Sequence, residues 1–246
     1  MTRALSMRWT NLAFLHWRVD PERVQRLLPA GLQLDLFGGE AWVGVVPFRM
    51  SRVRPLMALA VPTASDFPEL NVRTYVRHGD RSGVWFFSLD AGSRLAVIGA
   101  RTAVGLPYFH ARMIEREVGG DVAYESKRIH WGAASAEFQA RYRPTGEVRL
   151  ADAGSLDHWL TERYSLFAMR RGVLLRLDIE HEHWPLQPAT ADVTVNSMAQ
   201  ASGIDLPAEA PRVLFAERLD VVARLPRRVN TAKPANEPPL PHASLR

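Results

Sequence analysis

Apolar and polar residues alternate along several short segments of this chain, a pattern typical of half-buried β-strands. The clearest example is the segment 69–77, ELNVRTYVR. One face of this predicted strand is apolar apart from a threonine and consists of Leu70, Val72, Thr74 and Val76. The opposite face is polar or aromatic and consists of Glu69, Asn71, Arg73, Tyr75 and Arg77. The segment is therefore predicted to lie in a sheet with two chemically distinct faces.

Other apolar or alternating segments predict further strands that are joined by glycine-containing turns. They cover 14–19, 32–37, 40–50, 82–91, 112–118, 122–131, 136–143, 164–169, 173–184 and 217–227. Hairpin turns are expected at Gly38–Gly39, at Gly119–Gly120 and near Gly172. Strands of this length and number predict a large sheet.

Three short helices are predicted between these strands. Asp20 is a good N-cap with Pro21 at the first helical position, and Ser155 is an N-cap for a helix over 155–164. The Ala/Val-rich segment 94–104 predicts a short buried helix. Strands and helices do not alternate regularly, which argues against a doubly wound fold. We expect an α+β fold in which a strongly curved antiparallel sheet or barrel carries a few short helices.

The chain is expected to form a single domain. Its 246 residues fit one large domain, which we assign to residues 1–225. The segment 226–246 is rich in proline, so we expect it to be a tail that extends from the body without packing tightly.

The composition narrows the range of functions. The chain has no cysteine, which excludes disulfides, thiolate metal sites and thiol nucleophiles. Its net charge of +5 comes mainly from arginines that are interleaved with acidic residues, so nucleic-acid binding is not expected. No apolar run approaches the roughly 18 residues of a membrane span, and the N-terminus has no signal-peptide pattern. We expect a cytoplasmic protein that does not bind membranes.

The polar face of the segment 69–77 has two interpretations. A polar stripe on a strand is most often the solvent side of a sheet. If the sheet closes into a barrel, the same face lines the interior and presents Glu69 and Arg73 to a small ligand. Arg101, in the apolar segment 94–104, is expected to be buried beside a carboxylate such as Glu69. We predict that the polar face lines a cavity.

His181 and His183, in EHEHW, fall on the same side of a predicted strand. Two histidines at this spacing can bind a metal, but a metal needs at least a third ligand, and none is nearby in the sequence. His16 would be that ligand only if the fold brings it to the pair. We favour the alternative that one histidine packs on Trp184 and the other is exposed, and we predict no metal site. No cofactor is expected either, because motifs for dinucleotides and phosphates are absent.

A resemblance to a known family rests on five blocks: FLHWRVDPERVQRLLPAGLQLDLFGGEAWVGVVPFRM, FPELNVRTYV, GVWFFSLDA, ERY and HWPL. Together they resemble the YqjF-like family (domain of unknown function 2071) over nearly the whole chain. That family is grouped with the acetoacetate decarboxylase-like superfamily, and the chain also resembles acetoacetate decarboxylases directly. The resemblance implies the acetoacetate decarboxylase-like fold, with Glu69 in the pocket.

The segment LAVIGARTAVGLPYFHA is similar to the part of acetoacetate decarboxylases that carries Gly-Arg-Glu followed by Pro-Lys-Lys. Arg101 and Pro107 have the same spacing as in that motif. One of the two lysines forms a Schiff base with the substrate ketone, and the other assists it. Tyr108 and Phe109 stand at these positions here, and neither side chain can form an imine.

The resemblance leaves a pocket without the Schiff-base lysines. Its expected polar and aromatic residues are Glu69, Arg73, Arg101, Tyr108, Phe109, His110, His16 and His181. The first hypothesis is a non-catalytic protein that binds a small anionic or carbonyl-bearing molecule. The second is a lysine-independent lyase or isomerase that acts on a small oxo- or hydroxy-acid, with Glu69 and Tyr108 as catalytic groups. The third is a metal-assisted enzyme built on the two histidines of EHEHW, and a homo-oligomer stays open in every case.

Overall fold

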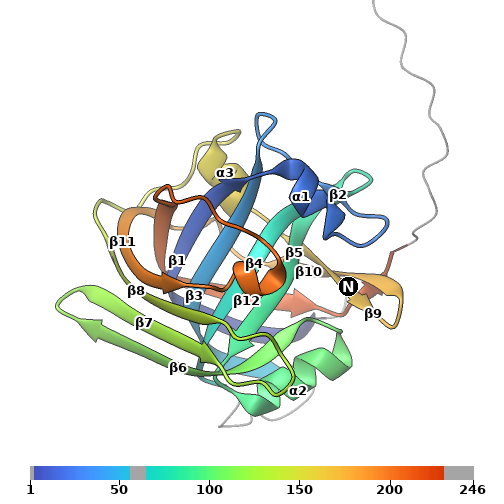
Figure 1. Cartoon of the computed structure of the whole chain (residues 1–246), viewed down its shortest axis with the longest axis horizontal. Helices are drawn as coiled ribbons and strands as arrows, with labels where there is room; N and C mark the ends of the chain where they lie inside the picture. Colours follow the sequence, from blue (N-terminus) through green and yellow to red (C-terminus); the bar gives the residue numbers. More distant parts are fainter. Residues whose placement is uncertain (1–2, 56–64, 230–246) are drawn as a thin grey trace, which may run out of the picture.

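The computed structural model describes residues 3–55 and 65–229, and β-strands dominate it (Figure 1). The longer strands are β1 (Arg3–Val19), β3 (Ala41–Pro55), β4 (Phe67–His78), β5 (Arg81–Ala91), β6 (Tyr108–Val118), β7 (Asp121–Arg128), β8 (Glu137–Pro144), β9 (Ser165–Arg170), β10 (Val173–Glu180), β11 (Gln187–Asn196) and β12 (Arg212–Arg224). The short ones are β2 (Gln33–Leu34) and β13 (Arg227–Arg228). The helices are α1 (Pro21–Arg26), α2 (Arg94–Ala103), α3 (Leu156–Thr161) and the 3-10 turn η2 (Gln200–Ser202). The predicted fold class, a closed and strongly curved sheet with a few short helices, is confirmed.

The sheet closes on itself along two circuits. In the first, the neighbouring strands are β5-β6-β7-β8-β11-β12-β1-β3-β4, with β4 returning to β5. In the second, they are β10-β9-β5-β4-β3-β1-β12, with β12 returning to β10. Because β12, β1, β3, β4 and β5 belong to both circuits, they form a wall between two interiors. Pairing among the described strands is antiparallel except at β5, which is parallel to β6 and β9.

A strand in such a wall is buried on both faces, and β4 shows this clearly. All residues from 69 to 76 are buried. Leu70 and Val72 pack into the first interior, where they belong to the same core cluster as Tyr124. Glu69 and Arg73 face the second interior. The alternation predicted from the sequence is correct, but neither face is the solvent side.

β1 changes its alternation at Asn11, so that apolar side chains face the second interior on both sides of this residue. Trp9 lines this interior before Asn11, and Leu12 lines it after. Asn11 has a positive φ of 52°, and the pairing of β1 with β3 shifts register between Thr10 and Leu15. This irregularity has the effect of a β-bulge, which moves the following side chains to the opposite face.

Local sequence signals explain several element ends. The side chains of Asp20 and Ser155 cap α1 and α3 as predicted, by accepting hydrogen bonds from backbone N–H groups in the first turn. The predicted hairpin near Gly172 joins β9 and β10. The turn predicted at Gly38–Gly39 is present, because Phe37 and Glu40 exchange backbone hydrogen bonds across it. The predicted pairing of the strands on either side is wrong, because β2 pairs with β4.

The C-terminal part of the chain stays on the sheet beyond the predicted domain boundary at residue 225. Arg227 and Arg228 form β13, which pairs with β10. Residues 230–246, most of the predicted proline-rich tail, lie outside the described residues. Within the described part of the chain, no helix is long and apolar enough to cross a membrane.

Candidate functional site

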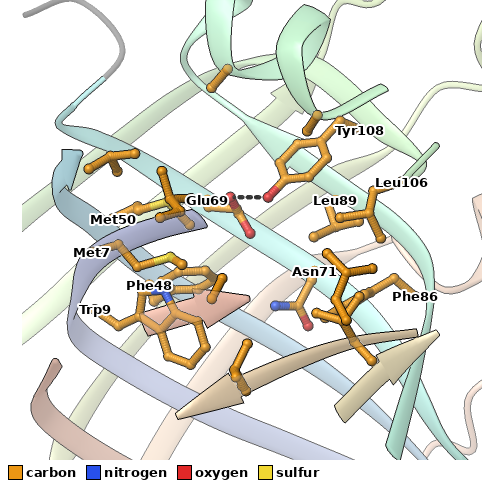
Figure 2. A pocket seen from close by; sticks show the side chains of 18 of the residues that line it. Met7, Trp9, Phe48, Met50, Glu69, Asn71, Phe86, Leu89, Leu106 and Tyr108 are labelled. Atoms are coloured by element: carbon orange, nitrogen blue, oxygen red, sulfur yellow. Dashed lines mark hydrogen bonds between the residues drawn. The ribbon is translucent and has the colours of Figure 1, made fainter. Parts of the chain in front are cut away.

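The second interior contains a cavity of about 490 Å³ that lies against β4 (Figure 2). This volume is typical of small-molecule sites. Most of the lining is apolar and includes Met7, Trp9, Phe48, Met50, Phe86, Leu89 and Leu106. Outside this apolar lining, the groups with ionisable or hydrogen-bonding side chains are Glu69, Asn71, Arg73, Tyr108, Thr161, Arg163 and His181. The prediction that the polar face of β4 lines a cavity is confirmed.

Glu69 and Tyr108 form a hydrogen-bonded pair in the cavity wall. β4 presents Glu69, and Tyr108 is the first residue of β6. The Tyr108 hydroxyl donates to Glu69 Oε2 at 2.9 Å, and both side chains are buried (Figure 2). The pair therefore joins the strand that carries the polar face to the start of β6.

Burial controls the protonation of this pair. It raises the pKa of Glu69 to about 8; the hydrogen bond from Tyr108 lowers this pKa, and the charge of Asp90 raises it. Burial and the charge of Glu69 also raise the pKa of Tyr108 well above its usual value. At neutral pH Glu69 is therefore mainly a neutral carboxylic acid, which has an O–H group to donate to a ligand.

Arg73 is a buried cation, 8% exposed, at the other end of the polar face. Within residues 3–55 and 65–229 no carboxylate forms an ion pair with it, and its Nε has no hydrogen-bond partner. Its guanidinium carbon lies 5.1 Å from the ring centre of Phe14 and 5.9 Å from that of Tyr75. Aromatic faces compensate a buried charge only partly, so the position suits an anionic ligand.

Arg163, on the segment that follows α3, brings a second guanidinium to the same end of the cavity. Its Nη1 donates to Asp35 Oδ2 at 2.7 Å and its Nε to the Trp159 carbonyl at 2.6 Å, while its buried Nη2 has no partner. Burial lowers the pKa of Arg163, the ion pair with Asp35 raises it, and the nearby charge of Arg73 lowers it. Arg163 was not predicted as a site residue, although the ERY block that carried part of the family resemblance contains it.

His16 lies behind the cavity wall and is not one of the lining residues. Its Nε2 is 2.6 Å from the hydroxyl of Tyr75, which itself donates to the Leu160 carbonyl at 2.9 Å. Since a phenol has one proton to donate, His16 Nε2 is the donor, and the buried, unpartnered Nδ1 carries no proton. Burial and the charges of Arg73 and Arg212 keep the pKa of His16 well below its usual value. His16 is thus a neutral support for Tyr75, and the prediction that it contacts a ligand is wrong for this cavity.

His181 lines the cavity, whereas the side chain of His183 is 64% exposed. The ring of His181 stacks on Tyr164 and meets Trp184 edge to face, with ring centres 4.6 and 5.4 Å away. Its Nδ1 donates to the carbonyl of Glu182, which leaves the buried Nε2 as an unpartnered acceptor. The favoured alternative, one histidine packed on Trp184 and one exposed, is confirmed. In the described ranges no three His, Asp or Glu residues are grouped so as to hold a metal ion.

Phe109 and His110 follow Tyr108 on β6, and neither lines the cavity. Side chains alternate along a strand, so Phe109 points away from the cavity that Tyr108 faces. The ring of Phe109 lies over the guanidinium of Arg128, 4.1 Å from its carbon atom. The prediction of ligand contacts for Phe109 and His110 is therefore wrong for this cavity.

Arg101 also lies outside the cavity. α2 is a surface helix in which Val97 is buried, whereas Leu95 and Ile98 are 54% and 57% exposed. Arg101 is exposed on this helix and donates to the Tyr108 carbonyl at 2.6 Å. The predicted burial of Arg101 beside Glu69 is wrong, because the apolar residues of α2 do not all face the interior.

Comparison with known families places these observations in context. A family model described as DUF2071, "Uncharacterized conserved protein (COG2071)", matches residues 6–220. The uncharacterized protein YqjF of Bacillus subtilis (strain 168) is 43% identical over 214 residues, which cover 87% of this chain and 88% of YqjF.

Several solved structures share the fold. The enduracididine biosynthesis enzyme MppR, complexed with the condensation product of pyruvate and imidazole 4-carboxaldehyde, has a TM-score of 0.68 at 14% identity, covering 95% of this chain and 92% of MppR. Acetoacetate decarboxylase from Legionella pneumophila has a TM-score of 0.63 at 17% identity, covering 91% and 87%. An acetoacetate decarboxylase-like enzyme from Sphingomonas wittichii RW1 has a TM-score of 0.60 at 18% identity, covering 93% and 94%. At these identities the likeness establishes an acetoacetate decarboxylase-like fold and says nothing about the reaction.

Proposed function

This chain belongs to the YqjF-like DUF2071 family and has an acetoacetate decarboxylase-like fold, and we propose that it binds a small anionic or carbonyl-bearing molecule in the cavity beside β4. The observation that carries the proposal is Arg73, a buried cation without a carboxylate partner among the described residues, in the wall of a largely apolar cavity. A buried charge of this kind is costly unless a counter-ion is bound.

The lining supports binding without Schiff-base chemistry. Lys127, the one lysine of the described residues, is exposed on β7 and pairs with Glu137 at 2.6 Å. Tyr108 fills the position that faces the cavity after Pro107. A similar fold binds a small oxo-acid, since MppR has been solved with pyruvate.

Ligand binding can be measured with the tryptophans of the cavity. Trp9 and Trp184 line it with ring centres 5.8 Å apart, so their fluorescence reports on an occupant. We expect carboxylates to perturb this fluorescence saturably in the wild-type protein and at least tenfold more weakly in Arg73→Gln. Arg77→Gln is the matched control, because Arg77 is exposed on the same strand. Equal binding by both variants would remove the support that Arg73 gives to the proposal.

A second candidate function, a lysine-independent lyase or isomerase, is favoured by the Glu69–Tyr108 pair. A group with a pKa of about 8 is well matched to proton transfer near neutral pH. The protonated carboxyl can polarise a ligand carbonyl, and the ionised one can take a proton from the neighbouring carbon.

This second function is tested by deuterium exchange next to the carbonyl of bound oxo-acids, followed by NMR. Exchange catalysed by ionised Glu69 should increase with pH and level off above about pH 8. Glu69→Gln should abolish it, whereas Glu217→Gln, at an exposed position, should not change it. Binding without exchange would favour the non-catalytic function.

A further inference from the structure

We propose that the ligand is an elongated, amphipathic monocarboxylate with a carbonyl group remote from its carboxylate. The carboxylate binds between Arg73 and Arg163, an apolar chain runs along β4, and the carbonyl accepts a hydrogen bond from Glu69. This inference rests on the proposed function and adds the class and the orientation of the ligand.

The separation of the polar groups requires length. Glu69 and Arg73 are four residues apart on the same face of β4, so their backbone positions are about 13 Å apart at roughly 3.3 Å per residue. Asn71 lies between them, and its buried Oδ1 has no hydrogen-bond partner. The side chains also have separate contacts, since the Arg73 guanidinium lies over Phe14 and Tyr75 whereas Glu69 contacts Tyr108. We therefore expect that a short acid bound at Arg73 does not reach Glu69.

The charge at the arginine end selects a monoanion. The guanidinium groups of Arg73 and Arg163 carry two positive charges, and Asp35 compensates one of them. Both arginines have a buried nitrogen without a partner, Nε of Arg73 and Nη2 of Arg163. One negative charge therefore neutralises this end, whereas a dianionic phosphate would leave a buried negative charge uncompensated.

The Glu69 end is built for a neutral acceptor. Glu69 already accepts the hydrogen bond from Tyr108, and as an acid it has its own proton to donate. A second carboxylate here would meet this buried acid without a cation in contact. A ligand carbonyl accepts the proton of Glu69 without adding charge.

The cavity wall near Tyr108 includes part of α2, and the residues that this helix contributes are small. These residues are Ala96, Gly99, Ala100 and Ala103, at helical spacing. A Cβ added at Gly99 would have no atom within 4 Å. The apolar remainder of the wall fits a hydrocarbon chain and gives a short polar acid little to contact.

The experiment is calorimetric titration of the full chain with acids of increasing length. The probes are pyruvate, hexanoate, octanoate, decanoate, the methyl-ketone derivatives of octanoate and decanoate, decanol and decyl phosphate. We expect the affinity for the acids to rise with chain length. Each ketone derivative should bind at least fivefold more tightly than its parent acid. Decanol and decyl phosphate should bind at least tenfold more weakly than decanoate. Arg73→Gln and Arg163→Gln should each weaken the acids at least tenfold and leave decanol unchanged, and Arg73→Lys should recover part of the loss.

Glu69→Ala and Tyr108→Phe locate the carbonyl. Tyr108→Phe should keep the preference for the ketone derivative, because the proton of Glu69 remains, whereas Glu69→Ala should remove it without weakening decanoate. If pyruvate binds as tightly as the long acids and still depends on Arg73, the elongated ligand is wrong and the proposed function stands. If no acid binds with dependence on Arg73, both fail. Tighter binding of decyl phosphate would replace the monocarboxylate with a phosphate ligand.

Discussion

Arg128 and Asp90 form a bidentate ion pair beneath the ring of Phe109. Arg128 Nη2 donates to Asp90 Oδ1 at 2.6 Å and Nε to Oδ2 at 2.9 Å, and both side chains are buried. Phe109 covers this pair, while its neighbour Tyr108 faces the cavity. These two neighbouring residues of β6 therefore have different surroundings, one in the cavity wall and the other over a buried ion pair.

The ion pair should be important for stability. Arg128→Ala leaves the Asp90 carboxylate buried without its partner, so we expect a loss of about 3–5 kcal/mol in the free energy of unfolding. Urea denaturation measures this, with Arg116→Ala, at an exposed position of β6, as a near-neutral control. Adding Asp90→Asn to Arg128→Ala should recover part of the loss, and no recovery would contradict the account.

The opposite directions of Tyr108 and Phe109 predict which position can hold a reactive lysine. The wild-type protein, incubated with acetoacetate and borohydride, should keep its mass, because no described lysine faces the cavity. Tyr108→Lys puts an amine in an apolar cavity, where desolvation lowers its pKa, and should be trapped as a secondary amine. Phe109→Lys points toward Arg128 and should not be trapped. A borohydride-stable adduct on wild-type Lys127 would defeat this prediction.

Glu69 should make the stability of the protein depend on pH in an unusual direction. Burial raises its pKa in the folded state from 4.5 to about 8, so the folded protein holds a proton that the unfolded chain releases. The contribution of this group is fully present below pH 4.5, decreases by about 1.4 kcal/mol per pH unit as the pH rises, and is lost above about pH 8.

Glu69→Gln removes this dependence. The variant should gain stability relative to the wild type as the pH rises from 4.5 to about 8, and the difference should be constant above that. Urea denaturation across this range measures it, with Glu217→Gln as the exposed control. A difference that does not change with pH would show that Glu69 is already ionised in the folded protein.

Two glycines should respond to alanine in opposite ways. A Cβ at Gly44 would lie 3.0 Å from His16 Nε2, and His16 is fixed by its contact with Tyr75, so Gly44→Ala should destabilise by about 1–3 kcal/mol. Gly99, inside α2, has open space around its Cβ position, so Gly99→Ala should stabilise by up to about 1 kcal/mol through helix propensity. Thermal unfolding compares the two, and a stabilising Gly44→Ala would refute the packing of His16.

The sequence predicted local features well and long-range ones poorly. The faces of β4 and the caps Asp20 and Ser155 follow from neighbouring residues, and all were correct. The double closure of the sheet depends on pairs such as β1 with β12 and β5 with β9, and no local pattern encodes which distant strands pair.

The candidate site shows the same difference between features that depend on neighbouring residues and features that depend on distant ones. Glu69, Arg73, Tyr108 and His181 were predicted and do line the cavity. Phe109 was predicted to contact the ligand but does not line the cavity. Successive residues of a strand face opposite sides, so Tyr108 and Phe109 cannot both face the cavity. A predicted strand that began at Tyr108 would have excluded Phe109. Arg163 was missed because its partners Asp35 and Arg73 are distant in the sequence.

Because β4 lies between two interiors, its even-numbered and odd-numbered residues face different interiors. Even-numbered residues such as Leu70 and Val72 hold the sheet together, and odd-numbered residues such as Glu69 and Arg73 meet whatever occupies the cavity. If β4 paired with its neighbours one residue out of register, Glu69 and Arg73 would face the apolar core. Such a pairing error would therefore strongly destabilise the sheet. Substitutions at the cavity-lining positions 69, 71 and 73, by contrast, leave the core cluster that contains Leu70 and Val72 intact, so ligand preference can change in evolution while the architecture is inherited unchanged.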